Sequence, residues 1–125
     1  MGEPINHRRL IAWQEAIKLV ELVYRETSNF PREEAFGLKA QIRRSAVSIS
    51  SNIAEGAGRN SSGELIQFLG FASGSRAELD THLEIAVRLG FIRKDSEAIP
   101  QLSRVGKLLV GLRRSLKHRS VGDQT

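Results

Sequence analysis

The chain of 125 residues contains no cysteine, and this absence excludes disulfide bonds, thiolate metal sites and thiol nucleophiles. Three prolines and 11 glycines are too few for a low-complexity or collagen-like chain. No apolar run reaches the roughly 18–20 residues that cross a bilayer, and the N-terminus lacks the apolar core of a signal peptide. We therefore expect one soluble, cytoplasmic domain with no membrane partner, because domains usually hold about 100–150 residues.

The net charge of +5 comes from the C-terminal end of the chain. Residues 1–99 carry 13 basic and 13 acidic side chains, whereas residues 100–125 carry six basic side chains and only Asp123 as an acid. Such a segment is typical of proteins that contact phosphates, although a solvated helix face with cations near its C-terminus has the same pattern. If phosphates are bound, we expect the main contacts from Arg104, Lys107, Arg113, Arg114 and Lys117, and further contacts from Arg43, Arg44 and Arg59.

Apolar residues recur at helical spacing in four segments, and no segment alternates as a strand does. Ser61 and Glu64 have the spacing of a capping box at the start of the third segment. Short connections between long amphipathic segments predict an all-α, antiparallel up-down-up-down four-helix bundle. The segments cover residues 10–27, 31–56, 61–90 and 95–118, so the domain would span residues 1–118, with residues 119–125 as a disordered tail.

Polar and small side chains form a second line beside the apolar stripes of the middle segments. Such side chains could face solvent, form a hydrogen-bonded network between helices, or contact another subunit, and Arg44 could instead pair with Glu55 or Glu78. Gly70 and Gly74 lie mid-helix at a cost of about 1 kcal/mol each, which predicts the close approach of another helix there. The candidate interface or network residues are Gln41, Arg44, Ser48, Asn52, Glu55, Gly74, Ser75 and Glu78.

Groups that would support catalysis or bind a metal are not apparent. His7, His82 and His118 are far apart in sequence, and no nucleophile stands beside a base at a recognisable spacing. The connector between residues 56 and 61 lacks the ending of a P-loop. Most of the seven aromatic residues lie on apolar stripes, so base stacking is not expected to contribute much. We expect no catalytic residue, no metal and no cofactor.

Five short motifs between Trp13 and Leu79 carry a family resemblance that covers roughly residues 8–117. They are Trp13-Gln14-x-Ala16, Tyr24-x-x-Thr27-x-x-Phe30-Pro31, Gly37-Leu38-x-x-Gln41-Ile42-Arg43-Arg44-Ser45-Ala46-x-Ser48, Asn52-Ile53-Ala54-Glu55-Gly56, and Phe68-x-x-x-Ala72-x-Gly74-Ser75 with Glu78-Leu79. Together they resemble the bacterial 23S rRNA-intervening sequence proteins, which are encoded within genes for large-subunit ribosomal RNA. The segment from Asn52 to Gly56, with the Arg-Arg pair before it, is the most specific of these motifs.

The resemblance implies an up-down-up-down bundle that assembles into a ring-like homopentamer. The accessory protein of diversity-generating retroelements is similar to this family, so the resemblance also implies RNA or DNA, and a reverse transcriptase or other protein, as partners. We therefore expect a non-enzymatic, homo-oligomeric bundle that binds nucleic acid non-specifically through phosphate contacts. The alternative is a structural or protein-interaction module that binds no nucleic acid and uses the polar line on the second segment as its interface.

Overall fold

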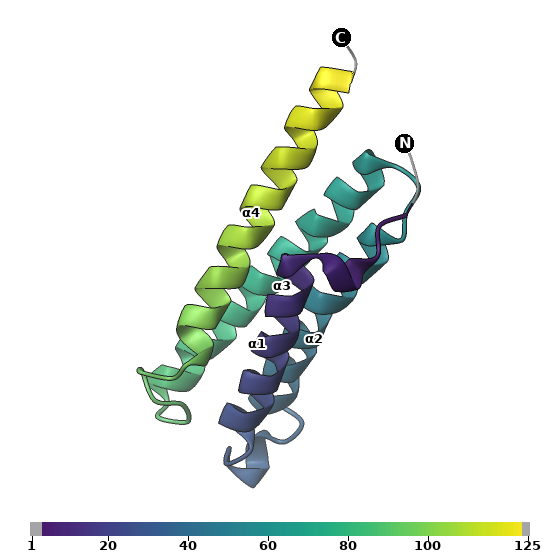
Figure 1. Ribbon diagram of the computed structural model, residues 1–125. Coiled ribbons are helices and arrows are strands. Elements are labelled where there is room, and N and C mark those ends of the chain that lie inside the picture. Colours follow the sequence, from purple (N-terminus) through teal and green to yellow (C-terminus); the bar gives the residue numbers. More distant parts are fainter. Residues whose placement is uncertain (1–3, 124–125) are drawn as a thin grey trace.

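The computed structural model describes residues 4–123, with side chains described for residues 4–119, and this part of the chain is all-helical. Its four α-helices lie alongside one another, an arrangement compatible with the predicted order (Figure 1). None of these helices combines the length and the apolar character that a membrane span requires. The elements in chain order are the 3-10 helix η1 (His7–Arg9), α1 (Ile11–Thr27), the 3-10 helix η2 (Arg32–Glu34), α2 (Leu38–Ala57), α3 (Ser62–Arg88) and α4 (Ala98–Asp123).

A single apolar core runs between the four helices, and each α-helix contributes fully buried side chains to it. Leu19 of α1, Ile49 of α2, Leu79 of α3 and Leu109 of α4 are all 0% exposed. Burying a side chain of this size stabilises the fold by about 1.5–3 kcal/mol. Of these four, Ile49, Leu79 and Leu109 lie on the predicted apolar stripes, whereas Leu19 does not.

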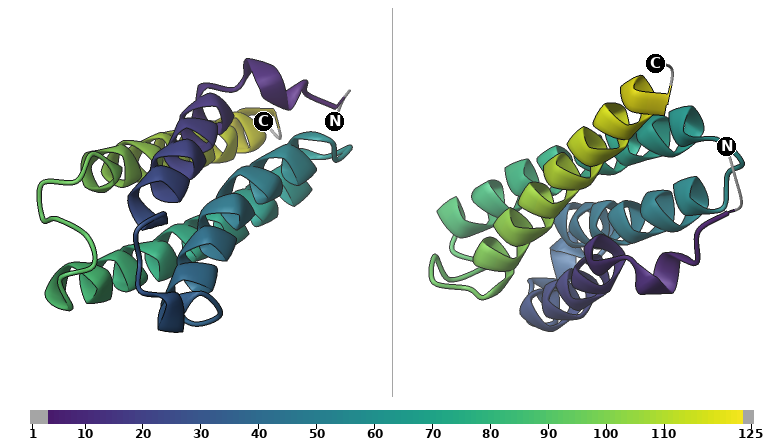
Figure 2. Two further views of the ribbon diagram at one scale, coloured as in Figure 1. Left: turned by 90° about the horizontal axis from the view of Figure 1, so that it is seen from below. Right: turned by 45° about the horizontal axis from the view of Figure 1, so that its top comes forward.

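The helices α2 and α3 lie side by side, which both views of Figure 2 show. Near their connection, a Cβ at Gly56 would stand only 2.7 Å from the Cβ of Phe68. Only glycine fits at this approach without a shift of the neighbouring helix. Gly56 therefore has a packing role that the sequence alone did not assign to it.

α4 is the longer partner of α1 and continues past it, which is visible in Figure 1. Contacts between the two helices join Glu15, near the start of α1, to Gln101 and Arg104 in the first turns of α4. The later turns of α4 have α3 as their neighbour, because Arg113 contacts Gly70 there. The two halves of α4 thus have different surroundings.

The predicted start of the second helix at residue 31 was wrong. Residues 32–34 form the 3-10 helix η2, and α2 begins only at Leu38. Gly37 has φ −104° and ψ −115°, which is not helical, so it separates the two elements. The side chain of Glu34 caps the new start, because its Oε1 accepts a hydrogen bond from the Leu38 N–H at 3.0 Å.

The fourth helix also differs at both ends from its prediction. It begins at Ala98, whose N–H donates to Ser96 Oγ at 3.1 Å, and it continues to Asp123 instead of ending at His118. A helix adds one backbone hydrogen bond per residue as it grows, so it can extend without an apolar stripe. Residues 124 and 125 of the predicted tail lie outside the described residues.

The start of the third helix follows the capping prediction in part. Ser61 Oγ accepts a hydrogen bond from the Glu64 N–H at 3.2 Å, as predicted. The Glu64 carboxylate, however, accepts from the Ser61 hydroxyl at 3.3 Å and not from the Ser61 backbone N–H. After α3, Gly90 has φ +79°, a left-handed conformation that favours glycine and turns the chain towards α4.

Candidate nucleic-acid interface

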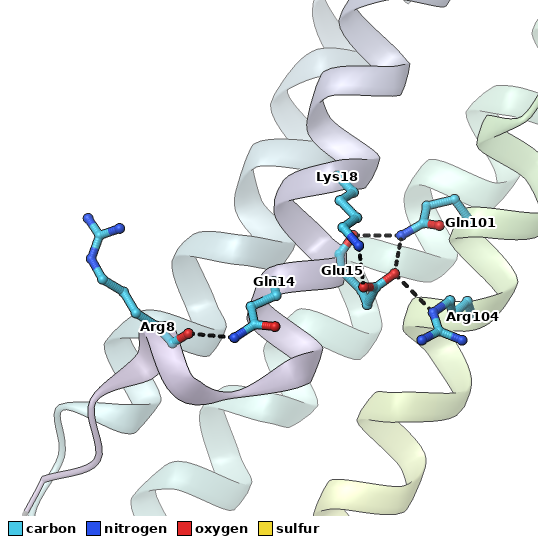
Figure 3. Close-up of polar contacts among 6 residues, drawn as sticks. All are labelled: Arg8, Gln14, Glu15, Lys18, Gln101 and Arg104. Carbon is cyan, nitrogen blue, oxygen red and sulfur yellow. Dashed lines mark hydrogen bonds and ion pairs between the residues drawn. The ribbon is translucent and has the colours of Figure 1, made fainter.

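A buried carboxylate joins the first half of α4 to α1. Glu15 is only 7% exposed, and its Oε1 accepts hydrogen bonds from Arg104 Nε at 2.9 Å and Gln101 Nε2 at 3.0 Å (Figure 3). Its other oxygen accepts from Lys18 Nζ at 3.0 Å. Gln101 Nε2 also donates to the backbone oxygen of Glu15, at 2.9 Å. Three donors from α1 and α4 thus share the two oxygens of the carboxylate.

The same contacts keep Glu15 ionised. The hydrogen bond from Gln101, followed by that from Lys18 and then that from Arg104, lowers the pKa of Glu15 from 4.5 to about 2, against the opposing effect of burial. The negative charge offsets that of Arg104, which was predicted to contact phosphate. Arg104 therefore has a structural role, because it holds α4 against α1.

Basic side chains in the second half of α4 have no such partner. Lys107, Arg114 and Lys117 are exposed, and Arg113 is half-buried. The five ion pairs among the described side chains involve none of these four residues. This half of α4 therefore presents positive charge that the rest of the described chain does not neutralise.

Most of the predicted α4 set meets at two hollows on the surface. The larger has a volume of about 710 Å³ and lies between α3 and α4, where Lys107, Arg113 and Arg114 line it with Arg76 of α3. Arg113 and Arg114 also line the second hollow, together with Lys117. The sequence prediction missed Arg76, because only the packing of α3 on α4 brings it to this place.

The predicted contacts on α2 and its following loop are partly used within the fold. Arg43 donates from Nε to Thr27 Oγ1 at 2.9 Å and from a terminal nitrogen to the backbone oxygen of Tyr24 at 3.1 Å. Arg59 pairs with Glu55 at 2.9 Å. Arg43 therefore joins the end of α1 to α2, whereas Arg59 pairs locally at the end of α2. Both are poorer candidates for phosphate contact than the α4 residues.

The polar line on α2 has two different surroundings. In its middle, Ser48 Oγ lies 2.8 Å from Ser75 Oγ of α3, and Asn52 Nδ2 donates to Ser48 Oγ at 3.1 Å, so these three side chains form a network between helices. The other members are exposed, and Arg44 pairs with neither Glu55 nor Glu78 among the described side chains. The exposed candidates are Gln41, Arg44 and Glu55 of α2 and Glu78 of α3. A contact of this line with another subunit stays a prediction.

The predicted close approach of a helix at Gly70 and Gly74 was wrong. A Cβ at Gly74 would meet nothing within 4 Å, because this residue faces outward from α3. At Gly70 the nearest neighbour is the guanidinium group of Arg113, at 3.5 Å, and not a backbone. The described contacts give Gly74 no packing role.

Three of the seven aromatic side chains are exposed, whereas the other four are buried or half-buried, in line with the expectation that most pack inside. Phe36 is 98% exposed, and Tyr24 and Phe71 are 43% and 50% exposed. Phe36, Tyr24 and Val47 line one hollow together with Arg44. Three exposed apolar side chains thus gather at one place on the surface.

No group of three or more metal-ligating side chains gathers within the part of the chain that the structure describes.

A family model described as the 23S rRNA-intervening sequence protein matches residues 8–111. The match therefore ends before Arg113, Arg114 and Lys117. No curated protein matches the chain.

The fold is similar to that of a crystal structure from Bacteroides thetaiotaomicron, a protein of unknown function from the S23 ribosomal protein family. The two chains share 22% sequence identity with a TM-score of 0.74. The likeness covers 82% of this chain and 98% of the other. At this level of identity, the comparison establishes the shared fold.

Proposed function

The chain belongs to the 23S rRNA-intervening sequence protein family, and from this premise we propose that it is a non-enzymatic, homo-oligomeric bundle that binds nucleic acid through phosphate contacts. It acts in the cytoplasm on RNA or DNA, and a reverse transcriptase or another protein is a further candidate partner. The antiparallel up-down-up-down order of the helices belongs to the same proposal.

The observation that carries the proposal is the unpaired positive charge on the second half of α4. Lys107, Arg114 and Lys117 are exposed, and no ion pair among the described side chains involves them. Contacts from such side chains bind the phosphate backbone and carry no sequence information of their own. The family match ends at residue 111, so Arg114 and Lys117 lie beyond the matched residues.

Self-association supports the same activity by raising the charge of the particle. The family resemblance implies a homopentamer, in which five copies of a +5 chain would carry about +25 and attract polyanions over a long range. The exposed side chain of Phe36, beside Tyr24 and Val47, supplies an apolar contact suited to another subunit.

Charge reversal on α4 tests the nucleic-acid proposal. We expect Arg113→Glu, Arg114→Glu and Lys117→Glu together to weaken the binding of single-stranded RNA and DNA by about 100-fold or more, because three phosphate contacts become repulsive. Binding is measured by fluorescence anisotropy at low salt, and circular dichroism checks that the helices remain folded. Undiminished binding would show that another surface makes the contacts.

The matched control reverses three other exposed arginines. Arg9→Glu, Arg25→Glu and Arg32→Glu produce the same change in net charge, and none of these residues forms an ion pair among the described side chains. We expect this variant to retain binding within a few-fold of the original chain. An equal loss in both triple variants would mean that net charge matters and that α4 is not the interface.

A protein-interaction module without nucleic-acid binding is the second candidate, and the exposed Phe36 favours it. In that case Phe36→Ser would change the oligomeric mass in solution while no oligonucleotide binds at any salt concentration. Under the leading proposal, the oligonucleotide binds the original chain at low salt. Sedimentation velocity and anisotropy, measured on the same samples, separate the two candidates.

A further inference from the structure

Two arginines cross the contact between α3 and α4 in opposite directions, each over a glycine of the facing helix. Arg76 of α3 lies over Gly106 of α4, where an added Cβ would stand 2.8 Å from Arg76 Cδ and 3.0 Å from its Nε. Arg113 of α4 lies over Gly70 of α3, with a guanidinium nitrogen 3.5 Å from the Cβ position. A mid-helix glycine costs about 1 kcal/mol, and at Gly106 this cost has a reason, since any side chain there would displace Arg76.

Both guanidinium groups lack an anionic partner although they are partly removed from water. Arg76 and Arg113 are half-buried, and neither belongs to an ion pair among the described side chains. The Nε–H of Arg113 is buried and finds no acceptor in this part of the chain. Arginine is rarely buried without a partner, and a buried donor without an acceptor costs about 1–3 kcal/mol or more when it is charged. Neither guanidinium group is therefore neutralised by an ion pair within the described part of the chain.

Arg76 and Arg113 line one hollow, and their side chains lean towards each other across it. Residue numbers rise along α3 as they fall along α4, because Gly70 meets Arg113 and Arg76 meets Gly106. Long helical side chains lean towards the N-terminus of their own helix, so Arg76 and Arg113 lean towards each other. The hollow of about 710 Å³ that both residues line is within the size range of small-molecule sites, about 300–1,000 Å³.

We propose that this hollow is an oxyanion site that takes a phosphate monoester between Arg76 and Arg113. A monoester carries about −1.5 to −2 charges at neutral pH, which matches two guanidinium groups, whereas a phosphodiester carries only one charge. The planar guanidinium fork also fits phosphate oxygens with paired hydrogen bonds. Lys107 and Arg114 line the same hollow and add to its positive potential.

One acidic side chain lines the hollow and directs where the anion lies. Asp80 is one helical turn beyond Arg76, on the side away from Gly70. Ten residues of α3 separate Gly70 from Asp80, which is about 15 Å along the helix. The phosphate between the two arginines is therefore placed on the Arg113 side of Arg76, away from Asp80.

The inference rests on the proposed function for the source of the phosphate, which is the phosphorylated end of a nucleic-acid strand. Internal phosphates lie along the exposed α4 residues, and the terminal monoester occupies the hollow. Inorganic phosphate has the same chemistry and is the other source. The experiment below includes a probe for each source.

A pair of glycine variants tests the site without changing any charge. Gly106→Ala displaces Arg76, whereas Gly63→Ala meets open space in the first turn of α3 and does not line the hollow. The probes are short single-stranded RNAs with a 5′-phosphate, with a 3′-phosphate, or with hydroxyl groups at both ends. We expect the full chain and Gly63→Ala to bind a phosphorylated RNA about tenfold more tightly than the hydroxyl RNA, and Gly106→Ala to lose this preference.

A second pair of variants tests the site without replacing a glycine of α4, so the result does not depend on how alanine changes that helix. Arg76→Gln and Arg88→Gln each remove one positive charge from α3, but Arg88 is exposed and pairs with Glu84. Only Arg76→Gln is expected to lose the preference for a phosphorylated end. Equal loss in Arg76→Gln and Arg88→Gln would overturn the site.

Inorganic phosphate, followed by ³¹P NMR, separates this inference from the proposed function. If phosphate binds the original chain and not Gly106→Ala, while no RNA end is preferred, the site stands with free phosphate as its ligand. If every RNA binds alike and phosphate does not bind, the inference is wrong and the proposed function is unaffected. If phosphate binds in the hollow and no RNA binds at all, the proposed function is wrong and the oxyanion site remains.

Discussion

The two halves of α4 use basic side chains in different ways. In the first half, Arg104 lies against α1, where it donates to Glu15 at 2.9 Å, and Gln101 completes the contact. In the second half, Arg114 and Lys117 are exposed and belong to no ion pair of the described chain. The difference follows from helix length, because α4 continues past the start of α1 (Figure 1). Similar residues on one helix are therefore structural at one end and available for binding at the other.

The largest expected effect concerns the structural half. Glu15→Ala should lower the free energy of unfolding by about 2–3 kcal/mol, because Gln101 and Arg104 lose a charged acceptor. Urea unfolding followed by circular dichroism measures this change. Affinity for oligonucleotides should stay within a few-fold. A strong loss of binding with no loss of stability would reverse the roles assigned to the two halves.

Acid titration sharpens the same contrast. Because the pKa of Glu15 is about 2 in the folded chain and 4.5 in the unfolded chain, its stabilisation is fully present above pH 4.5 and is lost as the pH falls towards 2. The contribution at neutral pH is on the order of 2–3 kcal/mol, which is the same stabilisation that Glu15→Ala removes. Glu15→Gln should lack this pH-dependent part, which unfolding measured between pH 5 and pH 2 would reveal. Identical pH profiles for the variant and the original chain would contradict the role of the ionised carboxylate.

Single neutralisations along α4 give the smallest effects and the most direct contrast. Arg104→Gln should reduce stability by about 1 kcal/mol, whereas Arg114→Gln should leave stability within about 0.5 kcal/mol. For oligonucleotide binding the order should be the opposite, with the larger loss in Arg114→Gln. Equal effects of both substitutions on stability and on binding would show that α4 is uniform along its length.

Local periodicity predicted the elements that depend on one helix face at a time. Leu102, Val105, Leu109 and Leu116 of the fourth apolar stripe are all buried. The cap at Ser61 forms because its partner, Glu64, is three residues away. Such features depend on spacing along the chain, which the sequence displays directly.

Contacts between distant segments were not predictable in this way. Arg104 and Glu15 are 89 residues apart, so nothing in either helix alone indicates that they meet. The same holds for Arg76 over Gly106, which depends on the alignment of α3 with α4. At Gly37 a local pattern was misleading. Glu33 and Glu34 predicted the first turn of the second helix, but the non-helical backbone at Gly37 separates them from α2.

The salt dependence of oligonucleotide binding tests the central claim most directly. If Lys107, Arg113, Arg114 and Lys117 each neutralise one phosphate, the logarithm of the association constant for single-stranded RNA should fall with the logarithm of the salt concentration, with a slope of about −3 per subunit. Replacing Arg114 and Lys117 by glutamine should make this slope shallower by about one. Binding that is independent of salt, or absent at low salt, would contradict the claim that the second half of α4 is a phosphate-binding surface.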